Sequence, residues 1–183
     1  MAQVGNLIAL PTFGEHGAVN VVVESPRGAT LKLTFDPDLG VMTLSRPLPQ
    51  GLVYPHDWGF IPSTRAEDGD PLDAIVVWDG VSYPGVVIAC RPIGVLQIEQ
   101  NNKETGERER NDRLAVLPVD APRWNSIGTI DDLGERACLE LEHFFRAAVA
   151  FEGKELRTVG WKGPAAAMKL VRASIRTTRG KRR

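Results

Sequence analysis

The first two-thirds of the chain consists of short apolar segments separated by turn-forming residues, and this pattern limits the possible folds more than any other feature. The 183 residues include 13 prolines and 18 glycines, which interrupt the apolar segments. Segments that are rich in β-branched residues, or that alternate apolar with polar residues, cover residues 19–24, 31–35, 41–44, 74–78, 86–90, 93–98 and 114–117. Short strands at this spacing favour a β-barrel or a β-sandwich.

The last third of the chain changes to a helical period. Apolar residues three or four positions apart predict one helix, on the face formed by Leu133, Ala137, Leu141, Phe144 and Ala148. A second helix is expected to begin at Pro164, because proline is favoured in the first helical turn. Its buried residues are expected to be Met168, Val171 and Ile175. Both apolar faces are interpreted as packing against the strands, so the chain is expected to be mainly β with two helices (α+β).

Composition excludes several classes of protein. The two cysteines, Cys90 and Cys138, are too few for a disulfide scaffold or a cysteine-based zinc site, and they suit a reducing compartment. No apolar run approaches the roughly 18 residues that a membrane span requires, and the first residues do not resemble a signal peptide. The protein is therefore expected to be cytoplasmic, with no membrane partner.

The formal net charge of −1 is unevenly distributed along the chain. Residues 172–183 contain six basic side chains and no acidic one, so the preceding residues have an excess of acidic groups. A basic tail can bind nucleic acid, but this tail has no interleaved aromatic residue and the acidic body would repel nucleic-acid phosphates. We therefore interpret it as a solvated terminus. One domain is expected in residues 1–176, followed by a basic tail in residues 177–183.

Three aspartates lie within six residues, at Asp68, Asp70 and Asp73. In an extended stretch Asp68 and Asp70 point to the same side, while Gly69 relieves steric strain and Pro71 bends the chain before the next strand. Crowded carboxylates raise one another's pKa values unless a cation neutralises them. Carboxylate oxygens are the ligands that a hard cation such as Mg²⁺ prefers. The alternative is a solvated acidic turn, because Asp-Gly is a common turn dipeptide.

Two isolated cations, Lys32 and Arg46, lie in strand-like surroundings upstream of the aspartates. They could be surface charges whose aliphatic stems cover apolar residues. They could instead face the acidic turn across the mouth of a barrel, where they would form a pocket for a polyanion. A phosphate compound with Mg²⁺ is the ligand that such a pocket suits.

Three segments together resemble the soluble family I inorganic pyrophosphatases. They are residues 54–61, which run from Tyr-Pro to Gly-Phe-Ile, residues 68–74, which read Asp-Gly-Asp-Pro-Leu-Asp-Ala, and residues 91–95, which read Arg-Pro-Ile-Gly-Val. The similarity extends over roughly residues 19 to 176. It implies an OB-like five-stranded β-barrel with two flanking α-helices, which in bacterial relatives often assembles as a homo-oligomer, a hexamer.

The resemblance also implies roles for seven residues. They are the metal-site carboxylates Asp68, Asp70 and Asp73, the substrate-binding residues Lys32, Arg46 and Tyr54, and the supporting Glu24. Asp70 is similar to the family residue that takes the proton from the attacking water. The implied reaction is Mg²⁺-dependent hydrolysis of inorganic pyrophosphate to two phosphates by in-line attack of water, with several divalent ions at each site.

Several positions depart from the family pattern. This chain has Thr34 where the family usually has a glutamate, and Trp58 where it has a tyrosine. The family's Asp-Glu pair is replaced by Gln100-Asn101, its Asp-x-Lys motif by Asn111-Asp112-Arg113, and its Tyr-Lys pair by Ala148-Val149. Asp112 could replace the lost ligand only if its loop shifts register. These changes remove outer ligands for metal and phosphate, while the central aspartates remain.

Three hypotheses follow from this mixture. The leading one is Mg²⁺-dependent hydrolysis of pyrophosphate or a related phosphoanhydride, including organic diphosphates if loss of the Tyr-Lys pair opens the pocket. The second is a non-catalytic or altered-substrate relative that binds a metal and a phosphorylated ligand. The third is an OB-type nucleic-acid binder, which is the weakest because the body of the chain is acidic; a nucleic-acid partner is not expected.

Overall fold

The computed structural model describes residues 6–102 and 105–175. Its strands are β1 (Val19–Ser25), β2 (Leu31–Asp36), β3 (Val41–Pro47), β4 (Asp57–Ile61), β5 (Leu72–Val76), β6 (Val87–Asn101), β7 (Arg108–Arg110), β8 (Arg113–Pro118) and β9 (Arg157–Lys162). The α-helices are α1 (Glu135–Ala148) and α2 (Pro164–Ala173), and short 3-10 helices are η1 (Leu7–Ala9), η2 (Glu15–Gly17), η3 (Pro122–Trp124) and η4 (Ile130–Leu133). The basic tail expected at residues 177–183 lies outside the described residues.

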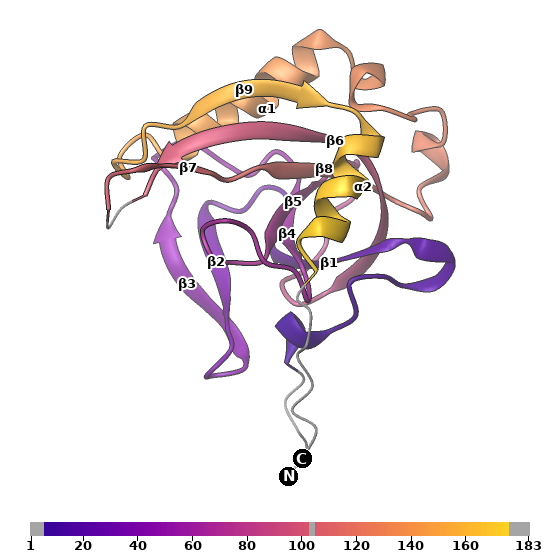
Figure 1. The fold of residues 1–183 in the computed structure, drawn as a ribbon, viewed down its shortest axis with the longest axis horizontal. Coiled ribbons are helices and arrows are strands. Elements are labelled where there is room, and N and C mark those ends of the chain that lie inside the picture. Colours follow the sequence, from indigo (N-terminus) through magenta and orange to yellow (C-terminus); the bar gives the residue numbers. More distant parts are fainter. Residues whose placement is uncertain (1–5, 103–104, 176–183) are drawn as a thin grey trace.

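Five strands close into a barrel (Figure 1). The order is β1-β4-β5-β8-β6, and β6 pairs back onto β1, so that each strand has two neighbours. Only β5 and β8 run parallel; the other pairs are antiparallel. Closure removes the exposed edges that a five-stranded sheet would otherwise have. The five-stranded barrel with two flanking helices is confirmed.

The longest strand, β6, also pairs with strands outside the barrel. Its second half extends beyond the barrel to pair with β7 and with β9. Residues 86–90 and 93–98 were expected to be separate strands, but β6 continues through both. Its register against β8 shifts between Pro92 and Gly94. A side chain at position 94 would lie 2.8 Å from Cβ of Ile130, so the strand bends where only glycine fits.

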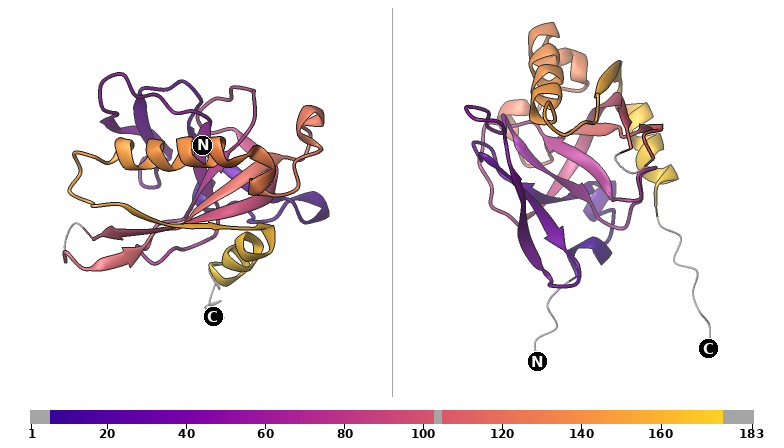
Figure 2. Two further views of the ribbon diagram at one scale, coloured as in Figure 1. Left: turned by 90° about the horizontal axis from the view of Figure 1, so that it is seen from above. Right: turned by 90° about the vertical axis from the view of Figure 1, so that its left-hand side faces the viewer.

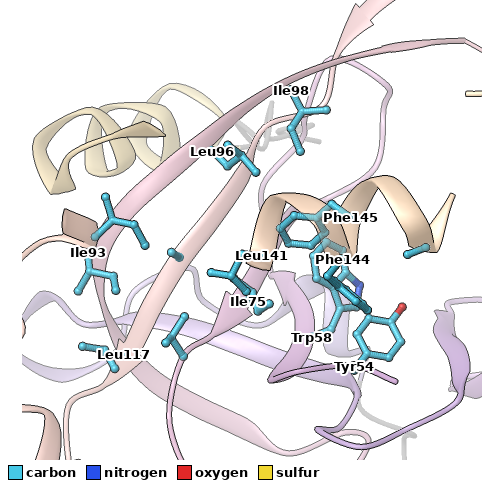
Figure 3. Packing of buried hydrophobic residues seen from close by; sticks show 14 of the residues in the cluster. Tyr54, Trp58, Ile75, Ile93, Leu96, Ile98, Leu117, Leu141, Phe144 and Phe145 are labelled. Carbon is cyan, nitrogen blue, oxygen red and sulfur yellow. The ribbon is translucent and has the colours of Figure 1, made fainter. Parts of the chain in front are cut away.

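Three apolar clusters form the core, and the two larger ones pack against the helices. One joins barrel residues such as Trp58, Ile75 and Leu96 to Leu141 and Phe145 of α1. Figure 3 shows the aromatic side chains of α1 lying over the barrel residues of this cluster.

The second cluster packs against the other helix, through Val171 of α2. The two helices lie on opposite sides of β9 (Figure 2, left). The predicted second helix ends at Ala173, before Ile175, which is 37% exposed and forms an isolated bridge with Thr64. Among the described residues, no helix has the length and apolar character that crossing a membrane requires.

The β2–β3 hairpin stands apart from the barrel sheet as a two-stranded ribbon (Figure 1). Its base is tied to β1, because Ser25 Oγ accepts from Leu33 N at 2.9 Å and Glu24 Oε1 accepts from Phe35 N at 3.0 Å. The ribbon therefore holds its side chains over one end of the barrel, next to the turn that precedes β5.

Candidate functional site

One cavity lies between the β2–β3 ribbon and the aspartate turn. It has a volume of about 520 Å³, and we call it the acidic cavity. Its polar wall includes Glu24, Lys32, Asp70 and Asp73, and its remaining wall is Asn6, Ile8, Thr34, Phe35, Pro37, Phe60 and Pro71. The structure therefore brings four of the seven predicted site residues to one cavity, although they come from β1, β2, the turn before β5 and β5 itself.

The aspartate turn is closed by its own backbone. Ala66 N donates to Asp70 O at 2.7 Å, and Gly69 N donates to Ala66 O at 3.1 Å. Gly69 has φ of +93°, a left-handed conformation that favours glycine. Asp68 Oδ1 accepts from Asp70 N at 3.2 Å, as is typical of an Asx turn. The turn thus fixes the direction of Asp68 before β5 begins at Leu72.

Asn111, which precedes β8, and Arg113, the first residue of β8, hold Asp68 and Asp73. Asn111 Nδ2 donates to Asp68 Oδ2 at 2.8 Å, and the Arg113 guanidinium forms an ion pair with Asp73. Asp73 and Arg113 are direct neighbours in the β5–β8 register. Asn111 and Arg113 are only 5% and 7% exposed, so these polar contacts are shielded from water.

The carboxylates of the acidic cavity repel one another. Burial is the main cause that raises the pKa of Glu24 to about 7, with Asp73 and Asp70 adding to it and the hydrogen bond from Phe35 N opposing it. Burial likewise raises the pKa of Asp68, and Asp73, Asp70 and Glu109 raise it further. Carboxylates in this state are stabilised by a nearby cation.

The carboxylates of the acidic cavity fit a hard divalent ion that needs few ligands from the protein. Among the described residues, no three histidine, cysteine, aspartate or glutamate side chains are grouped closely enough to enclose an ion. Mg²⁺ rarely needs such a cage, since it is commonly held by one or two carboxylates together with water and substrate phosphate. Asp70 and Asp73 at the acidic cavity offer such ligands, and the residues present therefore fit Mg²⁺.

A second, much smaller cavity shares a wall residue with the first and is lined by the two predicted cations, Lys32 and Arg46. It has a volume of about 30 Å³, and we call it the cationic pocket; it is lined by Lys32, Arg46, Tyr54, Trp58, Arg113, Phe144, Phe145, Ala148 and Val149. Lys32 is common to both cavities. It lies directly opposite Arg46 in the β2–β3 ribbon. Like charges in that position are destabilising unless an anion lies between or above them, so the ribbon is suited to a polyanion.

Aromatic side chains fill most of the cationic pocket. The Arg113 guanidinium carbon lies 4.8 Å from the centroid of the Trp58 ring and 5.2 Å from that of Phe145, distances at which cation–π attraction operates. The ring centroids of Tyr54 and Phe144 are 5.3 Å apart (Figure 3). Trp58 Nε1 and Arg113 Nε are buried N–H donors without a partner among the described residues. The remaining space suits one water or one phosphate oxygen.

The absence of the Tyr-Lys pair does not open the pocket. Ala148 and Val149 line it, but the Arg113 side chain, which packs on the Trp58 ring, also lines it, and the cavity measures only about 30 Å³.

Asp112 does not replace the missing carboxylate, because its side chain forms an ion pair with Arg110 at 2.8 Å and accepts from Ile98 N at 3.0 Å. The register shift that would bring Asp112 to the turn has not occurred.

The sequence did not lead us to predict the contacts of Asn111 with Asp68 and of Arg113 with Asp73. Both residues were noted only as substitutions in a family motif. A signal was present, because positions 111 and 113 are two apart and alternate residues of an extended segment share a side. Gln100 was noted in the same way, and its Nε2 donates to Glu109 Oε1 at 3.1 Å, next to this group.

Known proteins agree with this architecture. A profile of the inorganic pyrophosphatase family matches residues 21–179. Among curated proteins, inorganic pyrophosphatases of Thermus thermophilus and a Synechocystis strain are similar. The first is 38% identical over 179 residues, which is 96% of this chain and 99% of the relative; the second is 35% identical over 171 residues, which is 93% and 98%.

Solved structures give the same result. The crystal structure of the Thermus thermophilus inorganic pyrophosphatase superposes with a TM-score of 0.84 at 38% identity, covering 93% of this chain and 97% of that one. An inorganic pyrophosphatase structure from Coxiella burnetii has a TM-score of 0.82 at 29% identity, with 91% and 98% covered. The OB-like barrel expected from the sequence fits these structures. The chain belongs to the inorganic pyrophosphatase family.

Proposed function

We propose that this protein hydrolyses inorganic pyrophosphate to two phosphates with the help of Mg²⁺. The observation that carries the proposal is the position of Lys32, which lines the acidic cavity with Asp70 and Asp73 and the cationic pocket with Arg46. A diphosphate placed at Lys32 would have cations on one side and carboxylates on the other. When bound, Mg²⁺ supplies positive charge that acidifies water and neutralises the phosphate oxygens.

Asp70 is the proposed general base. Asp68 and Asp73 each have one oxygen held by Asn111 or Arg113, whereas no hydrogen bond to the Asp70 carboxylate occurs in residues 6–102 and 105–175. Asp70 lines the acidic cavity, and its carboxylate is proposed to accept the proton of the attacking water. The other two aspartates are proposed to serve as metal ligands, and Glu24 as a buried supporting carboxylate behind them.

The leaving phosphate is proposed to be held by Lys32, Arg46 and Tyr54. In-line displacement transfers negative charge to the departing oxygen, and the two opposed cations of the ribbon would neutralise that charge. Burial raises the pKa of Tyr54 to about 12, so the phenol stays protonated and acts as a hydrogen-bond donor. Preorganised donors of this kind stabilise the transition state without reorganisation.

Release of phosphate from pyrophosphate, with and without Mg²⁺, tests the proposal. Wild type is expected to release phosphate only with the divalent ion, and Asp70→Asn is expected to reduce the rate about 10²- to 10⁴-fold, the range for a general base. Asp120→Asn is the matched control, because Asp120 is exposed on the loop after β8. Equal rates for wild type and Asp70→Asn would reject the assigned base.

A second candidate is a relative that binds a metal and a phosphorylated ligand without turnover, or with another substrate. The neutral amides of Asn111 and Gln100 beside the turn favour it, because they offer less charge to a metal than carboxylates would. Calorimetry that finds pyrophosphate binding in the presence of Mg²⁺, together with no phosphate release, would select this candidate over hydrolysis.

We further propose that the protein acts in the cytoplasm as a homo-oligomer, by analogy with the hexamers of bacterial relatives. Both cysteines are free, which suits a reducing compartment. Light scattering during gel filtration measures the assembly directly, and a monomer mass at micromolar concentration would contradict the proposed oligomer.

A further inference from the structure

The side chains of Asn111, which precedes β8, and of Arg113, the first residue of β8, occupy oxygens that a metal ion would otherwise use. The amide of Asn111 donates to one oxygen of Asp68 at 2.8 Å, and Arg113 forms an ion pair with one oxygen of Asp73. Both holding residues are more than nine-tenths buried. Asp73 thus has one oxygen engaged by a donor of the protein itself, and Asp68 has both, because its other oxygen accepts from Asp70 N at 3.2 Å.

Arg113 is held firmly in this position. Its guanidinium stacks against Trp58 and Phe145, and its Asp73 partner is the adjacent residue in the β5–β8 register. A planar, always charged guanidinium in contact with two aromatic rings does not move aside for an incoming cation without losing those contacts. The positive charge that Asp73 attracts is therefore already partly supplied by the protein.

The oxygens left for a divalent ion are few. Asp73 can present one unengaged oxygen and Asp70 its carboxylate, both oxygens of Asp68 already accept a hydrogen bond, and the described residues contain no group of three that encloses an ion. Mg²⁺ requires six ligands in a near-regular octahedron. The protein alone would leave most of these positions to water, whereas a diphosphate held at Lys32 brings several further oxygens to the same cavity.

We propose that Asn111 and Arg113 are positioning residues that make divalent-ion binding depend on the phosphate ligand. The ion binds weakly to the free protein and tightly once a diphosphate completes its ligand set. This inference rests on the proposed function, since it takes a diphosphate as the ligand. By reciprocity, the ion must strengthen binding of the diphosphate by the same factor.

The substitution Asn111→Asp isolates the effect. It replaces one NH₂ donor by an oxygen and leaves the size of the side chain unchanged. The new carboxylate would no longer hold Asp68 but would repel it, and the two together would offer up to four oxygens to a cation. Asn111→Ala also releases Asp68 without adding a buried charge, and it serves if the aspartate variant folds poorly. Asn125→Asp adds the same charge at an exposed position after η3 and is the control.

Titration calorimetry with Mn²⁺ and with Mg²⁺ provides the test, in the absence and presence of imidodiphosphate, a diphosphate whose bridge is N–H. For wild type, the analogue is expected to tighten ion binding about tenfold or more. Asn111→Asp is expected to bind the ion about tenfold more tightly than wild type without the analogue, the equivalent of one charge-assisted contact. Asn111→Ala should tighten it about threefold. Melting temperatures should follow, with Asn111→Asp stabilised by the ion more than wild type.

Equal ion affinity with and without the analogue in wild type would overturn the inference, as would an Asn111→Asp variant that binds the ion like wild type. The proposed function would survive either result if phosphate release from pyrophosphate remained ion-dependent. Failure of the proposed function looks different: wild type would bind neither the ion nor imidodiphosphate, alone or together, and would release no phosphate.

Discussion

The acidic cavity and the cationic pocket share Lys32 but differ in space and in charge. The acidic cavity encloses about 520 Å³ between carboxylates and an apolar wall, whereas the cationic pocket retains about 30 Å³ among arginines and aromatic rings. The first has room for ions, water and part of a substrate. The second can admit little more than one oxygen atom. One side of the site is therefore built to hold exchangeable ligands, and the other to position a phosphate.

The comparison also shows that losing large side chains does not by itself create space. Thr34 and Ala148 are both smaller than the residues that the family pattern has at these positions. Around Thr34 the cavity is wide, but beside Ala148 the Arg113 side chain and its two aromatic neighbours fill the volume. Whether a small residue opens a pocket depends on whether a neighbour is long and rigid enough to occupy it.

Among the changes that test this comparison of the two regions, the largest effect is expected from removing the cation that they share. Lys32→Met keeps most of the aliphatic stem and removes the charge. A charge-assisted hydrogen bond contributes about 1.5–3 kcal/mol, so kcat/KM for pyrophosphate is expected to fall about 10- to 100-fold. Steady-state phosphate release measures it, with Lys169→Met on the exposed face of α2 as the control. An unchanged kcat/KM would mean that the two regions do not act on one ligand.

Glu24 allows the electrostatics of the acidic cavity to be tested without substrate. Its pKa in the folded protein is about 7 against 4.5 ordinarily, so the folded state binds the proton more tightly than the unfolded state does. The contribution of protonated Glu24 to the free energy of unfolding is therefore fully present below about pH 4.5. It is lost as the pH rises to about 7, which lowers the free energy of unfolding by at most about 3 kcal/mol. Glu24→Gln should remove this decline.

Urea unfolding at several pH values, in metal-free buffer, checks the prediction for Glu24. Glu107→Gln, at an exposed position before β7, is the control and should keep the decline. Added Mg²⁺ should flatten the wild-type profile, because a cation stabilises the ionised carboxylate. If wild type and Glu24→Gln show the same dependence on pH, the acidic cavity does not carry the uncompensated charge described above.

A smaller effect is expected in the cationic pocket from the indole of Trp58. Trp58→Phe keeps a ring against Arg113 but removes the buried N–H donor. If that donor meets a phosphate oxygen, kcat/KM should fall about 2- to 10-fold, the equivalent of one neutral hydrogen bond. Trp161→Phe is a close control, because Trp161 Nε1 is also buried without a partner in the described part of the chain but does not line the pocket. Equal effects of both substitutions would indicate a packing role.

Local patterns in the sequence predicted much of the fold. Alternation and β-branched residues located β1, β2 and β3 to within a few residues. The helical period located α1, although the predicted face began at Leu133, which lies in η4 just before the helix. The strand β4 was recognised only as a motif, because Asp57 and Gly59 are poor strand residues. A side chain at position 59 would lie 1.9 Å from Val22 O, so glycine is required there by a distant strand that local patterns do not reveal.

The site divides in the same way. Asp68, Asp70 and Asp73 could be predicted because three aspartates in one turn are a local signal. The contacts of Asn111 and Arg113 could not, because they depend on the parallel pairing of β5 with β8, about 40 residues apart. Residues that supply the chemistry were therefore visible in the sequence, and residues that position them became visible only in the folded structure.

The smallest effect is expected at the rim of the cationic pocket. Arg46 Nε lies 3.5 Å from Glu152 Oε1, and both side chains are partly exposed, so the pair contributes little, at most about 1 kcal/mol. Glu152 competes with the substrate phosphate for the Arg46 guanidinium. Glu152→Gln should weaken this competition and lower KM for pyrophosphate less than about threefold. Glu140→Gln breaks the exposed Arg136–Glu140 pair on α1 and should leave KM unchanged. A higher KM in Glu152→Gln would instead show that Glu152 holds Arg46 in its binding position, which would make this rim an ordered part of the phosphate site.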